Sequence, residues 1–279
     1  MTSHEALESP FGGPARYLSS LPTAELAVRY RDKCGAEIAW AFHDVQSISL
    51  FECEATGYQF WRPAEVAGDE RFYQTLAAHW KTYYRESRWE YGPASQQCEQ
   101  SARVLEVGCG RGYFLRQIEQ HVASAEGVEL NTEAAASKVT RAEVHTRPLA
   151  ELAATRAQAF DVVCSFQVLE HIVEPRRFIL DCSALLKPGG RLVLSTPNHA
   201  CASNRDFSDP FNLPPHHMGH FSADTYARLA PQVGLRFERC FIQPSRSPSS
   251  NPLVRLASNI WRSLTREPGP NLLVVLRKE

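Results

Sequence analysis

The sequence lacks the features of a membrane, secreted or zinc-knuckle protein. Its 279 residues contain nothing close to the ~20 consecutive apolar residues that cross a bilayer. The opening MTSHEALESPFGGPARYLSS has neither a basic start nor an apolar run, so we expect no secretion signal and a cytoplasmic location. The eight cysteines form no C-x-x-C pair, which removes the usual structural zinc and dithiol redox sites.

An excess of charge of one sign is also missing. The 30 basic and 31 acidic side chains leave a net charge of -1, so no uniform field covers the molecule. We therefore expect neither nucleic acid nor membrane as a partner, and a small molecule becomes the expected ligand. A hydrophobic content of 43% is enough for a large core in one or two domains.

The chain divides into three parts by composition. Glycines and prolines among small polar residues predict a disordered tail over 1–20. Residues 21–95 are rich in aromatic side chains and predict an N-terminal cap, with a strand-like stretch at 48–60 and a helix whose one face carries Phe72, Leu76, Trp80 and Tyr83. From 96 to 279, short apolar runs alternate with amphipathic stretches, which is typical of a parallel sheet wrapped by helices.

The periodicity of this third part places its elements. It predicts strands at 102–108, 125–130, 142–146, 160–166, 191–197, 234–242 and 271–278, and helices at 112–122, 132–141, 175–186 and 252–265.

The segment VLEVGCGRGYFL (104–115) is the sharpest chemical signal. An apolar strand runs into Gly108, Gly110 and Gly112 and then into a helix, which leaves backbone amides open to an anionic or carbonyl group. A dinucleotide fingerprint reads G-x-G-x-x-G, whereas these glycines follow G-x-G-x-G and Tyr113 stands at the next position. Pyrophosphate binding is therefore disfavoured.

This loop, with Glu106 two residues before it, resembles the first motif of the class I S-adenosylmethionine-dependent methyltransferases. GVEL (127–130), FDVVCSFQVLEHI (160–172) and LKPGGRLVLSTPN (186–198) resemble further motifs of that family, in the family's order. The resemblance implies S-adenosyl-L-methionine as cofactor. It also implies an α/β, Rossmann-like fold: a seven-stranded, mostly parallel sheet whose antiparallel last strand inserts beside the fifth.

Cofactor-binding residues follow from these motifs. Glu129 ends the second strand, where a carboxylate can accept both ribose hydroxyls. After the third strand the family often has an acid for adenine, but this chain reads HTRPLAEL (145–152), so Leu149 or a backbone group would serve there. The full expected set is Glu106, Gly108, Cys109, Gly110, Gly112, Glu129, Leu130, Leu149, Phe166 and Gln167. Asp161, Glu170 and His171 are expected to brace the sheet edge.

A long loop at 198–229 carries His199, His216, His217 and His220, and its PPHH segment resembles loops of bacterial small-molecule and sugar methyltransferases. A neutral imidazole can take a proton from a hydroxyl as a methyl group arrives. His217, His216 and His220 are therefore the candidate catalytic residues. No H-x-x-x-H pair lies on a predicted helix, so we expect no metal.

Several alternatives stay open. The predicted reaction is methyl transfer to a hydroxyl of a small molecule or sugar. The alternatives are an N-methyltransferase that acts on a small amine and a non-catalytic, cofactor-binding partner subunit; a homodimer is also open. Cys34 with Arg31, and Cys53 with Thr56, resemble halves of the two knuckles of a zinc ribbon that has lost its metal. Tyr83, Tyr84 and Arg85 are expected to close over the methionine end of the cofactor.

Overall fold

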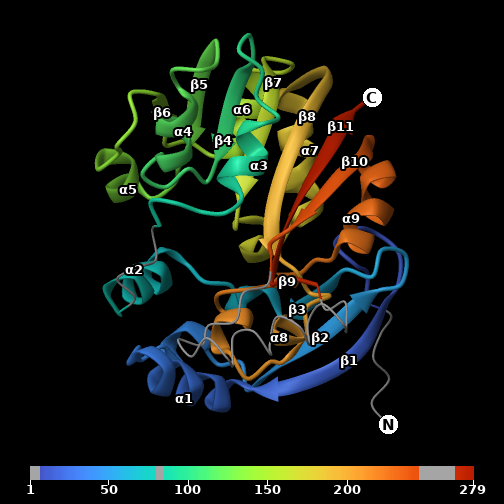
Figure 1. Cartoon of the computed structure of the whole chain (residues 1–279). Helices are drawn as coiled ribbons and strands as arrows, with labels where there is room; N and C mark the ends of the chain where they lie inside the picture. The colour runs from blue at the N-terminus through green and yellow to red at the C-terminus, as the bar shows by residue number, and fades with distance from the viewer. Residues whose placement is uncertain (1–6, 80–84, 245–267) are drawn as a thin grey trace, which may run out of the picture.

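The computed structural model describes residues 7–79, 85–244 and 268–279, which form an upper part around a large sheet and a lower part around a small one (Figure 1). The predicted helix at 252–265, Trp80, Tyr83 and Tyr84 lie outside the described residues. Within these residues, no helix is both long and apolar enough to span a membrane.

The large sheet has seven strands, as the motifs imply. In sheet order they are β10 (Leu235–Ile242), β11 (Asn271–Lys278), β8 (Leu186–Pro197), β7 (Phe160–Phe166), β4 (Arg103–Val107), β5 (Ser124–Val128) and β6 (Glu143–His145). The five from β8 to β6 run parallel, while β11 is antiparallel to both of its neighbours. The expected insertion of the last strand beside β8 is confirmed.

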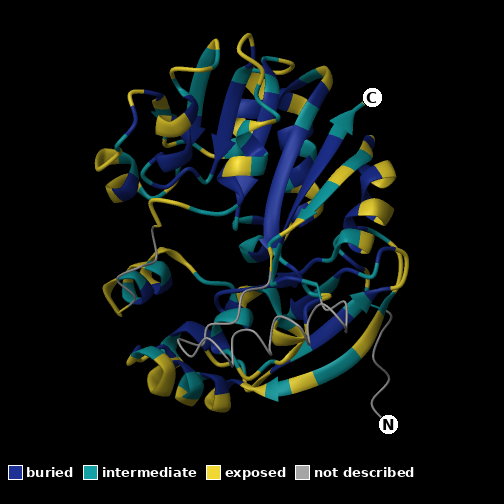
Figure 2. Ribbon diagram, viewed as in Figure 1, coloured by how far each residue is buried: buried dark blue, intermediate teal, exposed yellow. Residues whose placement is uncertain are grey.

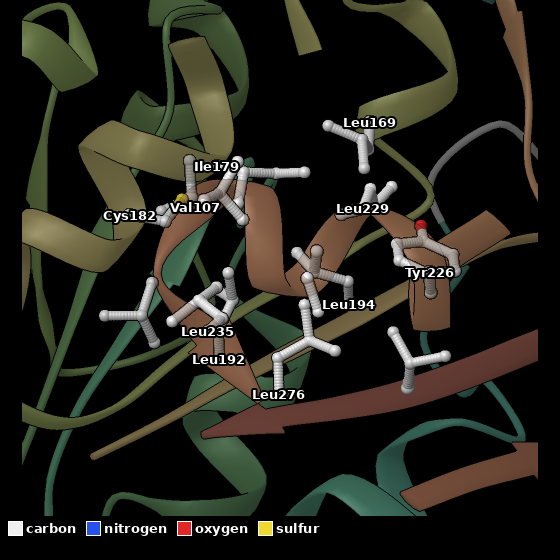
Figure 3. Close-up of a cluster of buried hydrophobic side chains, with 14 of the residues drawn as sticks. Val107, Leu169, Ile179, Cys182, Leu192, Leu194, Tyr226, Leu229, Leu235 and Leu276 are labelled. Carbon is white, nitrogen blue, oxygen red and sulfur yellow. The ribbon is translucent and has the colours of Figure 1, made fainter. Parts of the chain in front are cut away.

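Helices cover both faces of this sheet. They are α3 (Tyr91–Ser95), α4 (Tyr113–Ile118), α5 (Thr132–Ala136), α6 (Leu149–Thr155), α7 (Pro175–Leu185) and α9 (Ala223–Leu229). Helices α3 and α4 pack on one face with Val104 and Val193, whereas α6, α7 and α9 pack on the other with Leu105, Leu192 and Leu194. Figure 3 shows side chains from that second cluster, and Figure 2 shows the central strands buried. Successive residues of a strand point to opposite faces, so a strand covered by helices on both faces needs apolar side chains at neighbouring positions, as at Val104 and Leu105.

The predicted strands agree with the structure more closely than the predicted helices do. Helices α4 and α5 are several residues shorter than 112–122 and 132–141. Strand β8 begins at Leu186, directly after α7, rather than at Arg191, because Leu186 already pairs with Phe160 of β7 before the register shifts.

The lower part contains a four-stranded sheet in the order β1 (Ala15–Pro22), β2 (Ser47–Cys53), β3 (Gln59–Arg62) and β9 (Gly219–His220). It is packed with α1 (Thr23–Cys34), α2 (Glu70–His79), three short 3₁₀ turns and α8. These turns and α8 are η1 (Ala39–Phe42), η2 (Ala64–Val66), η4 (Pro210–Asn212) and α8 (Ala202–Arg205). A second hydrophobic core lies here, and it includes Leu213 and Met218 of the long histidine loop. The loop is therefore part of the cap.

The prediction of a disordered tail over 1–20 is wrong for the described residues. Strand β1 pairs with β2 from Ala15 to Pro22, and Phe11 is buried against Tyr58 at 5.1 Å between ring centroids. The glycines and prolines shape a turn before β1, and the aromatic contact supplies the burial that holds it.

The predicted boundary at 96 also shifts. Tyr91 and Ala94 of α3 are buried against the large sheet, not within the cap. Asp161, expected as a brace, takes that role: its Oδ2 accepts the backbone N–H of Arg103 at 2.9 Å, and Lys187 donates to both oxygens.

Candidate cofactor and acceptor site

The glycine bend between β4 and α4 has the tight backbone turn that its sequence predicts. Gly108, Gly110 and Gly112 have φ of 73°, 54° and 75°, a region that side chains with a Cβ rarely adopt. A Cβ on Gly108 would lie 2.5 Å from Cγ2 of Val168. The bend therefore requires glycine for both its conformation and its close packing.

Glu129 holds the bend from the end of β5. Its Oε2 accepts the backbone N–H of Gly110 at 2.7 Å, and its Oε1 accepts that of Asn131 at 2.8 Å. Beside it, the Leu130 side chain is 63% exposed although it is large and apolar. An apolar side chain left in water next to a carboxylate offers a surface for a flat apolar ring.

Glu106 lies at the other side of the bend and is 3% exposed. Its Oε2 has no hydrogen-bond partner among the described residues. Burial raises the pKa of this carboxyl well above its ordinary value, Arg88 opposes that rise, and the nearby Glu129 adds to it. A buried oxygen without a donor is costly, so the geometry favours a cationic ligand group here.

The remaining predicted cofactor residues lie at the same edge of the sheet. Phe166 is buried in edge-on contact with Phe114, and the next residue, Gln167, has a φ of 55°. Leu149 begins α6 and is half-buried, and Cys109 is buried under the bend.

Sequence reasoning missed three residues near this edge or undervalued them. Arg88 lies 3.8 Å from Glu90, and it opposes the rise in the pKa of Glu106, Glu90 and Glu170. Glu90 is 2% exposed and accepts a hydrogen bond from the Ser195 hydroxyl at 3.4 Å. No motif marked Arg88 or Glu90, because they come from the segment before the first strand.

Glu170 was expected only as a brace, yet neither of its carboxyl oxygens has a hydrogen-bond partner among the described residues. It is 1% exposed, and burial raises its pKa to about 8. Its Oε1 lies 4.0 Å from Nε2 of His171. Both residues belong to the 3₁₀ turn η3 (Leu169–His171), which follows β7.

The structure brings two of the three candidate catalytic histidines together. His216 and His217 stack at 4.5 Å between ring centroids, and His171 contacts both, at 4.6 and 5.0 Å. Burial lowers the pKa of His171 to about 4 and of His216 to about 3, and that of His217 well below its ordinary value. These imidazoles are therefore neutral at pH 7.

His220 lies apart from this group. The indole N–H of Trp61 donates to its Nε2 at 3.0 Å, so that nitrogen is already used as an acceptor. The rings of His199 and Phe207 also contact it, at 5.1 and 5.4 Å between centroids. This arrangement makes His220 a weaker candidate for a proton acceptor than His216 and His217.

The suggested relic of a zinc ribbon finds no support. Cys34 packs against the core of the cap, whereas Cys53 belongs to the core under the large sheet. Their thiols donate to different backbone carbonyls, those of Tyr30 and Gly12. In the β2–β3 hairpin, the rings of Phe51 and Phe60 instead stack at 5.9 Å between centroids.

Comparison with known proteins agrees with this geometry. A family model described as a methyltransferase domain matches residues 77–239, more than half of the chain. The ubiquinone biosynthesis O-methyltransferase of Xanthomonas axonopodis pv. citri is 33% identical over 153 residues, which cover 52% of this chain and 58% of that protein. A protein of Mycobacterium tuberculosis named probable S-adenosylmethionine-dependent methyltransferase MT3114 is 34% identical over 157 residues, covering 54% and 55%. The chain thus spans little more than half the length of these relatives.

Solved structures share the fold. A SAM-dependent methyltransferase from Archaeoglobus fulgidus has a TM-score of 0.52 and 20% identity, covering 68% of this chain and 91% of that one. The [4+2]-cyclase SpnF has a TM-score of 0.51 and 17% identity, covering 68% and 79%. The fold and the glycine bend of this chain are those of the class I S-adenosylmethionine-dependent methyltransferases. Because its family model matches more than half of the sequence, this chain belongs to the methyltransferase-domain family.

Proposed function

We propose that this chain transfers a methyl group from S-adenosyl-L-methionine to a hydroxyl group of a small molecule or sugar. The observation that carries the proposal is the arrangement at the ends of β4 and β5. There Glu129 accepts a hydrogen bond from the glycine bend, beside the exposed Leu130. The relative named as a ubiquinone biosynthesis O-methyltransferase supports oxygen as the acceptor atom.

The residues present fit the cofactor. In the proposal, Glu129 binds the ribose hydroxyls and Leu130 covers one face of the adenine. Glu106 offers its unpartnered oxygen to the ammonium of the methionine portion, and Arg88 pairs with the carboxylate of that portion. Leu149, Phe166 and Gln167 lie at the same edge of the sheet and would contact the cofactor there.

The cofactor would supply an electrophilic methyl group on a sulfonium. The acceptor oxygen would form a bond to that carbon while the sulfur–carbon bond breaks, which would leave a neutral thioether, and the acceptor would lose its hydroxyl proton. The chain contributes alignment and exclusion of water, for which the buried walls around Glu106 and Phe166 are suited.

In this proposal the acceptor hydroxyl binds beside His217 and His216, and one of these two imidazoles accepts its proton. Nδ1 of His217 is buried without a hydrogen-bond partner among the described residues, whereas His220 is engaged by Trp61. His217 is thus the first choice of the three. A neutral amine acceptor would need no such group, and a non-catalytic subunit would need none either.

The experiment is methyl transfer from labelled S-adenosylmethionine to parallel panels of phenols, sugars and small amines, with cofactor binding measured by calorimetry on the same protein. The proposal expects product only in a hydroxyl panel and turnover at least about a hundredfold lower for His217→Ala, with unchanged cofactor affinity. His121→Ala removes an exposed histidine and serves as the control. Product from amines alone, or full activity of His217→Ala, would contradict it; cofactor binding without any product would support the partner-subunit alternative.

A further inference from the structure

Three histidines from two distant segments converge at the end of β7. His171 ends η3, and His216 and His217 come from the long loop, yet one ring nitrogen of each lies within 4.8 Å of the others. All three side chains are buried or nearly so. The expectation of no metal rested on the loop histidines alone and did not foresee that His171 would complete a set of three.

Hydrogen bonds to backbone carbonyls set the tautomers of two of these rings. Nδ1 of His171 lies 2.6 Å from the carbonyl oxygen of His216, and Nδ1 of His216 lies 2.9 Å from that of Phe211. A carbonyl oxygen only accepts, so each Nδ1 carries the hydrogen and each Nε2 keeps its lone pair. Metal-binding histidines are typically oriented by such a bond from the other nitrogen.

The surroundings of the three rings also call for a cation. His217 leaves its buried Nδ1 without a hydrogen-bond partner, and the adjacent Glu170 leaves both carboxyl oxygens without one, as far as the described residues show. Glu170 lies 4.0 Å from Nε2 of His171, and Glu90 is a second buried carboxyl near it. The positive charge of the nearby Arg88 acts on Glu170 and on His171.

We propose that His171, His216 and His217 bind one divalent transition-metal ion of the zinc type, with an open coordination position toward the acceptor. Resting on the proposed function, the ion would take the acceptor hydroxyl in that position and lower its pKa. The proton would then leave to solvent water, and His217 would act as a metal ligand rather than as the proton acceptor. Zinc–nitrogen bonds of ~2.0–2.1 Å place neighbouring ligand atoms about 3.4 Å apart, so nitrogens that lie within 4.8 Å of one another need to approach by at most about 1.4 Å. Three imidazoles with an open position form a known type of catalytic zinc site.

Neutral imidazole is the form that binds a metal, and the hydrogen bonds from Nδ1 of His171 and of His216 to carbonyl oxygens are those of that form. The ion would also join the end of β7 to the loop that carries Met218, whose backbone N–H already donates to the Glu170 carbonyl at 2.7 Å. The loop would then be locked onto the edge of the large sheet.

A second group of potential ligands, Glu126, Glu143 and His145, does not support the same inference. Glu126 already accepts two hydrogen bonds from Arg156, at 3.0 and 3.2 Å, and one contact from His145 at 2.9 Å. Its charge is thus neutralised by a side chain of this protein.

The test is the metal content of the untagged, full-length protein, produced with added zinc and desalted, together with titration by Co²⁺ followed in the visible spectrum. The proposal expects about one equivalent of metal and a tetrahedral Co²⁺ spectrum for the unaltered chain and for His121→Ala. His171→Asn and His216→Asn are expected to lower the metal content at least tenfold while circular dichroism and cofactor affinity stay unchanged.

The outcomes separate this proposal from the proposed function. Stoichiometric metal that His171→Asn removes would support the site even if no acceptor is ever methylated. Absence of metal and of a Co²⁺ spectrum in a folded protein that binds S-adenosylmethionine would overturn it, as would metal that persists in both variants. Should His171→Asn fail to fold, the Co²⁺ spectrum of the unaltered protein decides.

Discussion

Leu130 offers the cleanest separation of cofactor binding from stability. Its side chain is 63% exposed, so Leu130→Ala removes little that the folded chain itself buries. The substitution removes three carbon groups, each of which contributes ~0.8 kcal/mol when it is buried. Because 63% of the side-chain surface is left for a ligand to cover, the lost free energy of binding is ~1.5 kcal/mol. That corresponds to a roughly tenfold higher Kd for S-adenosylmethionine.

Calorimetry on the purified chain measures this Kd, and urea unfolding measures stability. Val28→Ala is the matched control, because Val28 is 42% exposed on α1, in the cap and away from the bend. We expect neither variant to change the free energy of unfolding by more than about 0.5 kcal/mol. A Kd that changes less than twofold in Leu130→Ala would refute the role of Leu130, and so would an equal change in both variants.

Three further predictions concern the framework. Gly112→Ala should lower the free energy of unfolding by ~2–4 kcal/mol, because the new Cβ would lie 2.4 Å from Thr140 Cγ2 at a φ of 75°. The control Gly234→Ala, at a φ of 69° with open space around the new Cβ, should lower it by only ~1–2 kcal/mol. Equal midpoints of urea unfolding for the two variants would contradict this prediction. Leu194→Ala, fully buried, should cost ~2–5 kcal/mol by the same assay, and a loss under 1 kcal/mol would show that the core can collapse there. Burial alone would raise the pKa of Asp161, but the ion pair with Lys187 and the hydrogen bond from the Arg103 N–H outweigh burial and lower this pKa. The stabilisation from Asp161 is therefore present above the unfolded pKa of ~3.9 and is lost as the pH falls through the folded pKa. Asp161→Asn should weaken the loss of stability at acid pH, and an unchanged pH dependence would contradict the assignment.

The sheet could be predicted because its strands are read locally. Runs such as FDVVCSF are buried on both faces and bounded by turn residues, and the parallel order follows once helices alternate with them. The N-terminal segment could not be read in this way. Strand β1 is ordered by pairing with β2, and Phe11 by its contact with Tyr58. Both contacts join residues about 25 to 50 positions apart, which no local pattern shows.

The site divides along the same line. Glu106, the glycines and Glu129 lie in one strand–turn–helix unit and the strand after it, so spacing alone places them together. The histidine cluster depends on His171, which comes from a segment 45 residues before His216. Arg88 and Glu90 reach the site through α3, whose packing on the large sheet was not apparent from composition.

A crystal of the chain grown with S-adenosylhomocysteine, the demethylated product, is the most direct measurement of the central claim. The account predicts adenosyl density across the bend, with the ribose hydroxyls on Glu129, the adenine against Leu130 and the sulfur directed toward His217. Density at another place, or an empty bend at ligand concentrations that saturate the protein in solution, would contradict it.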